Sequence, residues 1–232
     1  HARCPNSVLL PRDIVPVHKP TVRFYRIEPE QVADLMTAAT TILSPANIQT
    51  HAIGFLIGLL YCTGLRIHEA LNLTLGNIDM QRSMLHVAKG KFGKQRLVPM
   101  SPSTRTALSR YLAVRSPHAG TGRCSALLIG AYGKALSYRQ AYEGFLRLCR
   151  HCGLGGKPLP RLHDLRHNYA CRCLALWREE GRDVNAMLPV LATAMGHVDI
   201  THTQIYLHIE LGDLRHAAAL LNTRLNTHSE NE

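Results

Sequence analysis

The stretch Met84-Leu85-His86-Val87-Ala88-Lys89-Gly90-Lys91-Phe92-Gly93-Lys94-Gln95-Arg96-Leu97-Val98-Pro99 decides the fold class of this chain. Its two ends, residues 84–88 and 95–99, carry the apolar and β-branched side chains that are typical of strands. Residues 89–94 hold two glycines and three lysines, which indicates a hairpin tip between the strands. The apolar run 126–129 is the candidate for a further strand. We therefore expect a small three-stranded antiparallel sheet.

The rest of the chain has the apolar spacing of helices. Glu28-Pro29-Glu30 favours a helix start, because proline suits the first turn and acids suit the positive end of the helix dipole. A second helix at about 47–63 is apolar nearly all round and should be central. Further helices are expected at about 66–73, 102–116, 138–152, 163–180, 184–195, 199–208 and 211–223. The sequence therefore predicts a mainly α domain with one small sheet.

The ends of the chain differ from its middle in composition. Residues 1–26 are rich in proline and lack a helical period, which predicts an arm or linker. Residues 27–225 form one predicted domain. Residues 226–232 are polar and are expected to be a disordered tail.

The bulk composition indicates a polyanionic partner. The 232 residues have a formal net charge of +11 and a pI of about 9.6, which favours nucleic acid binding, although charge alone does not establish it. The chain has no apolar run of about 18 residues, so no membrane span is predicted. Seven cysteines without small-scaffold spacing, and no preceding secretory signal, favour free thiols in the cytoplasm.

Two cysteine clusters are the candidates for a metal site. Cys149 and Cys152 flank His151, and Cys171 and Cys173 lie further along. Both clusters fall in helical patterns, and neither has a second pair at zinc-finger distance. We expect no metal site.

Two short segments near the end of the chain hold groups suited to phosphodiester chemistry. His163 and Arg166 are three residues apart and share a helix face, and Tyr206 follows His197 by nine residues. Taken singly, the first pair also fits a solvated polar face, and a tyrosine in a helix is usually a packing residue.

Arg66 and Glu69 form a similar pair after the most apolar helix. Glu69 is placed to orient Arg66 or a nearby histidine through a charge-assisted hydrogen bond. The alternative is an ordinary surface ion pair, which contributes little. The break at Thr63-Gly64 puts Arg66 close to the core, and the chain has few acids, so we favour the orienting role.

Together these segments resemble the motifs of the tyrosine recombinases, also called phage integrases. Residues 63–71 resemble the first motif of the family, residues 90–99 its lysine hairpin, and residues 163–167 its second motif. Residues 195–197, with Tyr206 nine residues after His197, resemble the third. The motifs occur in the family's order between about residues 28 and 210, which covers the catalytic domain only.

The resemblance implies a catalytic-domain fold and a set of site residues. Tyr206 would be the nucleophile, activated by Arg66, Lys91, His163, Arg166 and His197. Glu69 would support the site, and Lys89, Lys94 and Arg96 would contact DNA. Two guanidiniums and the His197 imidazole can stabilise charge on the non-bridging oxygens of an attacked phosphodiester.

The same resemblance implies a reaction without metal, ATP or other cofactor. A phenol with a pKa near 10 needs a base, for which His163 is the candidate, and Lys91 is the candidate acid for the leaving 5′ oxygen. When the family's spacing to this acid is counted back from Val98-Pro99, it selects Lys91. When it is counted forward from Arg66, it reaches Gly90. The segment 177–188 between the second and third motifs is longer than in many relatives.

The implied partners are double-stranded DNA and further copies of the chain. Strand exchange between two sites requires several protomers, so we expect a tetramer on DNA in the nucleoid. The helix within 211–225 either docks on a neighbouring protomer or packs on its own core. The family usually has an upstream helical domain that clamps DNA; about 26 residues precede the predicted domain, so we expect that domain to be absent.

Three other functions fit parts of the pattern. A type IB topoisomerase uses the same active-site logic without a specific site. A DNA-binding regulator could keep the fold and lose the chemistry, but every catalytic position is filled. A metal-dependent nuclease fits least well.

Overall fold

The computed structural model of the chain describes residues 24–41, 47–87, 95–118, 124–197 and 201–207. Its elements are α1 (Pro29–Thr41), α2 (Ile48–Thr63), α3 (Ile67–Leu71), η1 (Leu75–Asn77), β1 (Ile78–Asp79), β2 (Met84–Val87), β3 (Arg96–Pro99), α4 (Pro102–His118), η2 (Ala131–Gly133), α5 (Tyr138–His151), α6 (Leu162–Glu179) and α7 (Val184–Met195). Residues 201–207 are helical as well.

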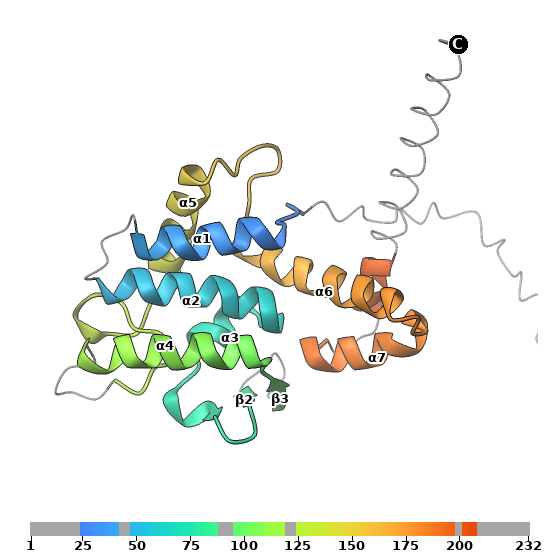
Figure 1. Cartoon of the computed structure of the whole chain (residues 1–232), viewed down its shortest axis with the longest axis horizontal. Coiled ribbons are helices and arrows are strands. Elements are labelled where there is room, and N and C mark those ends of the chain that lie inside the picture. Colours follow the sequence, from blue (N-terminus) through green and yellow to red (C-terminus); the bar gives the residue numbers. More distant parts are fainter. Residues whose placement is uncertain (1–23, 42–46, 88–94, 119–123, 198–200, 208–232) are drawn as a thin grey trace, which may run out of the picture.

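Helix α2 is the centre of the main core. It packs against α1, α4, α5 and α6, and α1 and α4 lie on its two sides (Figure 1). Leu56 and Ile57 on this helix are fully buried, as predicted from its apolar sequence. The Asn47 side chain caps the first turn by accepting a 2.9 Å hydrogen bond from the Gln49 N–H. Burying each large aliphatic side chain stabilises the fold by about 1.5–3 kcal/mol, so the core fixes this helix firmly.

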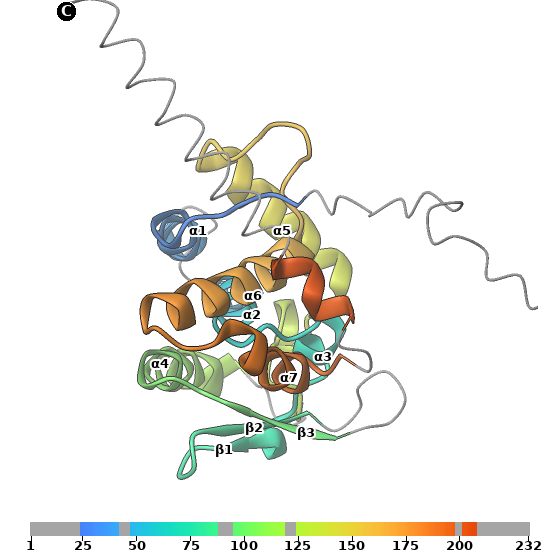
Figure 2. The same cartoon turned by 90° about the vertical axis from the view of Figure 1, so that its right-hand side faces the viewer.

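The sheet is antiparallel with the strand order β1-β2-β3. Strands β2 and β3 pair with Leu85 opposite Val98, which confirms the predicted hairpin strands. The predicted strand at 126–129 is wrong, because the outer strand is Ile78–Asp79. Residues 126–129 bend at residues 127 and 128 and make only isolated bridges, from Ala126 to Thr74 and from Ile129 to Ala135. Figure 2 shows the sheet beside α7 at one end of the molecule.

The predicted helices agree with the described ones to within two residues at each end. The mainly α architecture with a three-stranded sheet is therefore confirmed. The hairpin tip 88–94, the helix within 211–225 and the tail lie outside the described residues, as does most of the predicted arm. Within the described part, no helix is long and apolar enough to cross a bilayer.

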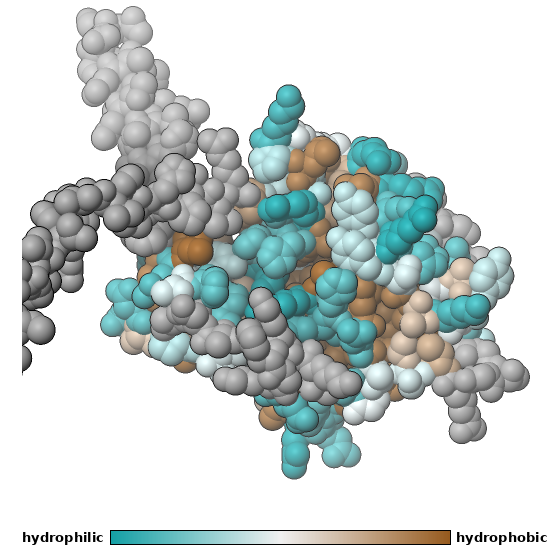
Figure 3. Space-filling view, turned by 180° about the vertical axis from the view of Figure 1, so that it is seen from behind, coloured by the Kyte–Doolittle hydropathy of each residue, from teal (hydrophilic) through white to brown (hydrophobic). Residues whose placement is uncertain are grey.

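A second, smaller core joins α6, α7 and the helical residues 201–207. Leu174, Leu191, Met195 and Tyr206 are buried together in it. This packing gives the Tyr206 ring a fixed place beside α6. The face of the molecule opposite to that in Figure 1 carries hydrophilic and hydrophobic residues interspersed (Figure 3).

Residues 24–28, which we call the strap, are tied to α6 by the side chain of Asn168. Its Oδ1 accepts a 3.1 Å hydrogen bond from the Ile27 N–H, and its Nδ2 donates to the Tyr25 carbonyl at 2.9 Å. The same Nδ2 lies 2.7 Å from the Asp164 carbonyl. Because Asn168 is buried, losing these bonds would leave backbone groups without partners. The chain therefore enters the domain directly against α6.

Candidate functional site

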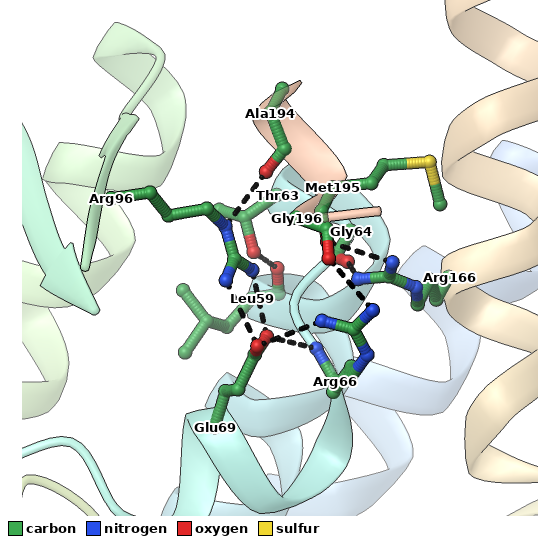
Figure 4. Close-up of polar contacts among 10 residues, drawn as sticks. All are labelled: Leu59, Thr63, Gly64, Arg66, Glu69, Arg96, Arg166, Ala194, Met195 and Gly196. Carbon is green, nitrogen blue, oxygen red and sulfur yellow. Dashed lines mark hydrogen bonds and ion pairs between the residues drawn. The ribbon is translucent and has the colours of Figure 1, made fainter. Parts of the chain in front are cut away.

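Three arginines from three parts of the chain meet at the C-terminal end of α7 (Figure 4). Each donates a hydrogen bond to one of three consecutive carbonyls. The bonds run from Arg96 Nε to Ala194, from Arg166 Nη2 to Met195 and from Arg66 Nη2 to Gly196, at 3.0, 2.8 and 2.9 Å. The carbonyl end of a helix is the negative end of its dipole, so it attracts cations. This arrangement brings β3, α6 and the start of α3 to one place.

Glu69 joins two of these arginines. Its carboxylate accepts two hydrogen bonds from Arg96, at 2.9 and 2.7 Å, and one from Arg66 Nη1 at 3.1 Å. It also accepts a 2.8 Å bond from the Arg66 N–H, which closes the first turn of α3. Burial by itself would raise the pKa of Glu69, but the Arg96 hydrogen bonds and the Arg66 N–H outweigh it and lower that pKa to about 2. Glu69 is therefore charged at neutral pH and orients both guanidiniums.

Arg166 is the most deeply placed cation of the site. Its residue is 2% exposed, and its Nη1 donates to the Gly64 carbonyl. Burial, and then the charge of Arg66, lowers the pKa of Arg166 to about 10, so it stays charged at neutral pH. Gly64 ends α2 with φ of 62°, and a Cβ there would lie 2.3 Å from the Tyr169 ring. Only glycine fits this position, which aims the carbonyl at Arg166.

Tyr206 lies beside this cluster with its hydroxyl engaged. Its Oη is 2.9 Å from Nδ1 of His167, and its ring is parallel to the His197 ring at 6.5 Å between centroids. Burial raises the pKa of Tyr206 to about 12, although the charge of Arg166 opposes the shift. The phenol is therefore protonated at neutral pH. Tyr206 is 4% exposed and packs in the smaller core beside the site.

The histidines of the site are neutral at pH 7. Burial, followed by the charges of Arg166 and Arg66, lowers the pKa of His197 to about 3. Its Nδ1 is 2.8 Å from the Thr203 hydroxyl, which orients the ring. Partial desolvation, followed by the charge of Arg166, also lowers the pKa of His163, which is the exposed histidine of the group. Neutral imidazoles can both accept and donate hydrogen bonds.

The sequence of the chain was compared with those of known protein families. The sequence matches the pattern described as Phage integrase family over residues 25–211. The chain belongs to the phage integrase family. It is 34% identical over 210 residues to y4rB of Sinorhizobium fredii, which is named as an integrase/recombinase, across 88% of this chain and 67% of the relative. It is 33% identical to the tyrosine recombinase XerD of Corynebacterium glutamicum, across 75% of this chain and 53% of the relative.

Solved structures share the fold of this integrase-family chain. XerA recombinase matches with a TM-score of 0.65 and 23% identity, over 85% of this chain and 65% of that one. XerH recombinase in a post-cleavage complex with its difH substrate matches with a TM-score of 0.64 and 22% identity, over 85% of this chain and 53% of that one. The integrase-family chain spans about half to two thirds of the length of these relatives.

Most of the predicted site residues converge. Arg66 is bound to Glu69, Arg66 and Arg166 donate to the adjacent carbonyls of Gly196 and Met195, and the Tyr206 ring is stacked with the His197 ring. The three hairpin lysines, Lys89, Lys91 and Lys94, lie outside the described residues.

Arg96, which we expected to contact DNA, is bound to other groups of the chain. Its guanidinium is bound to Glu69 and to the Ala194 carbonyl, and its side chain is 11% exposed. Gly196 packs directly on it, since a Cβ there would lie 2.7 Å from Arg96 Nη1. We therefore assign Arg96 to the support of Glu69 and α7.

The sequence interpretation missed His167, which contacts the Tyr206 hydroxyl where we had expected His163. His167 directly follows Arg166, and its partner is 39 residues away, so spacing alone gave no signal. In the described ranges, no three His, Cys, Asp or Glu side chains come together to hold an ion. Burial raises the pKa of the Cys149 thiol to about 12.

Proposed function

We propose that this chain is the catalytic domain of a site-specific DNA recombinase that cuts and rejoins one strand at a time through a 3′-phosphotyrosyl bond at Tyr206. The observation that carries the proposal is the convergence of Arg66, Arg166 and His197 beside Tyr206. These groups come from distant segments, and two adjacent carbonyls at the end of α7, those of Gly196 and Met195, each bind one of the two arginines.

The cations of the site suit the charge that develops during phosphoryl transfer. An in-line attack places negative charge on the non-bridging oxygens of the phosphodiester. The Arg66 side chain is 29% exposed, so it can reach a bound phosphate while Glu69 keeps its guanidinium oriented. Arg166 is anchored by two carbonyls and would present its remaining N–H groups. Donors fixed before the reaction need no reorganisation as the charge forms.

The proposed bond changes balance without a cofactor. Tyr206 Oη bonds to phosphorus as the bond to the 5′ oxygen breaks, and the leaving oxygen takes a proton from Lys91. The phenol proton passes to His163, which is exposed and neutral at pH 7. The phosphotyrosyl bond keeps the energy of the broken phosphodiester, so a 5′ hydroxyl of another strand can reverse the step. Lys89 and Lys94 would bind the DNA backbone.

The proposal includes partners and a location. The substrate is a double-stranded recombination site, and exchange between two sites takes a tetramer of chains, with residues 211–225 docking on the neighbour. A DNA enzyme of this kind acts at the nucleoid in the cytoplasm.

A trapping experiment tests the chemistry. The substrate is a pool of nicked duplexes with a randomised centre. Cleavage near the nick frees a short fragment that carries the 5′ hydroxyl, and its loss prevents rejoining. We expect the wild-type chain to form a covalent protein–DNA adduct in a chelator, and Tyr206→Phe to form none. Equal adduct from both proteins, or none from the wild type, would overturn the proposal. Relaxation of a supercoiled plasmid that lacks the sequence recovered from the adducts would instead favour a type IB topoisomerase.

A further inference from the structure

His167 makes a contact that the proposed reaction does not use. It follows Arg166 on α6, and its Nδ1 lies 2.9 Å from the Tyr206 hydroxyl oxygen. The distance is that of a good hydrogen bond. The atom it holds is the one that would attack the phosphodiester.

The His167 ring is held from two sides. Phe24 of the strap lies at 5.3 Å between ring centroids with an interplanar angle of 34°. The His163 ring meets it edge to face at 4.6 Å and 89°. Tilted and edge-to-face contacts are the favoured arrangements of aromatic rings. The orientation of the imidazole is therefore set by its neighbours on the strap and on α6, and not by the tyrosine alone.

The direction of the hydrogen bond follows from the acidity of the two groups. Burial, and then the charge of His163, lowers the pKa of His167 to about 4, whereas burial raises the pKa of Tyr206 to about 12. Both groups are neutral at pH 7, and the phenol is the stronger donor. Nδ1 therefore accepts, and the imidazole proton resides on Nε2. Since the two pKa values are far apart, the shared proton stays on the phenol.

We propose that His167 is a positioning residue for the nucleophile: it accepts the hydroxyl hydrogen of Tyr206 and so turns an oxygen lone pair toward the phosphodiester. A phenol hydroxyl otherwise rotates about its C–O bond, and few of its orientations suit in-line attack. The inference rests on the proposed function. As Tyr206 bonds to phosphorus, its hydroxyl hydrogen moves along the hydrogen bond to His167 Nδ1, and His167 gives its Nε2 proton to the neighbouring His163, the base of that reaction.

Matched substitutions separate the hydrogen bond from packing. In His167→Asn the side-chain amide oxygen can occupy the place of Nδ1, whereas His167→Gln carries its amide one bond further along. His167→Phe keeps a ring between Phe24 and His163 and removes the acceptor. His151→Phe on α5 is the control, because His151 is exposed. DNA affinity, measured by fluorescence anisotropy on a duplex with the sequence recovered from the wild-type adducts, reports whether each variant is folded and binds.

The readout is the single-turnover rate of adduct formation on the nicked duplex. We expect the rate of adduct formation by His167→Phe and by His167→Gln to fall at least about tenfold, the size of one net hydrogen bond, with unchanged DNA affinity. His167→Asn, which keeps the acceptor but cannot pass the proton to His163, should be faster than His167→Gln and slower than the wild type, and His151→Phe should match the wild type. An unchanged rate in His167→Phe, or failure of Asn to exceed Gln, overturns the positioning role. A faster rate in His167→Phe means that the contact restrains Tyr206, which also overturns it.

Imidazole ¹⁵N NMR of the free wild-type chain tests the same contact without DNA. The resonance pair that disappears in His167→Asn belongs to His167. We expect the Nε2–H tautomer with a hydrogen-bonded Nδ1, and a shift of Nδ1 in Tyr206→Phe. A protonated Nδ1, or no change in Tyr206→Phe, contradicts the inference even if adduct formation is normal. If no protein forms an adduct, the proposed function fails, and the positioning role fails with it.

Discussion

Replacing Glu69 by glutamine should destabilise the fold by about 3 kcal/mol at neutral pH. The substitution keeps the size of the side chain and removes the charge that pairs with Arg96 and Arg66. Folding lowers the pKa of this carboxyl from 4.5 to about 2, a change of about 2.5 units. At 1.36 kcal/mol per unit, this shift corresponds to roughly 3.4 kcal/mol of stability. Breaking a buried ion pair by removing one partner has a similar cost, about 3–5 kcal/mol.

The pH dependence of this loss has a defined sign. Because the folded-state pKa is depressed, the contribution of Glu69 is fully present above its unfolded value of 4.5 and is lost as the pH falls toward about 2. Glutamine mimics the protonated acid, so the wild type and Glu69→Gln should converge in stability across this range. The stability difference between them should be constant above pH 6.

Urea denaturation followed by circular dichroism measures these free energies of unfolding at a series of pH values. Glu143→Gln is the matched control, since Glu143 makes an exposed pair with Arg139 whose side chains are 57% and 86% exposed. Exposed pairs contribute little, so this variant should follow the wild type at every pH. A difference below about 1 kcal/mol for Glu69→Gln at pH 7, or one that does not shrink in acid, would refute the reasoning.

Three further changes test other contacts. Arg166→Lys supplies a single ammonium in place of a fork that binds two carbonyls, so the single-turnover rate of adduct formation should fall by about 10²–10³; a loss below tenfold would contradict a transition-state role. Asn168→Leu removes the bonds that tie the strap to α6 and should cost about 1–3 kcal/mol in urea denaturation, whereas an unchanged midpoint would mean that the strap is not held this way. A double-mutant cycle of His167→Phe and Tyr206→Phe should give a coupling of about 0.5–1.5 kcal/mol in unfolding free energy, and additive losses would deny the hydrogen bond between them.

The sequence predicted the parts of the site that depend on local spacing. The break at Gly64, the pair His163 and Arg166, and the interval from His197 to Tyr206 are all short-range patterns, and helix α6 converts the second of them into a shared face. The burial of α2 followed from its apolar sequence, because a helix that is apolar all round has no solvent face.

The remaining features depend on contacts that spacing does not encode. The run 126–129 reads as a strand because it is apolar, and residues 127–129 are indeed fully buried, but burial alone does not create a paired strand. Strand β1 has two residues, too few to show an alternating period. The bonds of Arg96 with Glu69 and of His167 with Tyr206 join residues 27 and 39 positions apart, and they arise only when the elements pack.

Mapping the attachment site of DNA on the protein tests the central claim most directly. The trapped adduct is digested with protease and nuclease, and the linked peptide is sequenced by tandem mass spectrometry. The account predicts a single nucleotide joined through its 3′ phosphate to Tyr206. A linkage to another residue, or attachment through a 5′ phosphate, would contradict it.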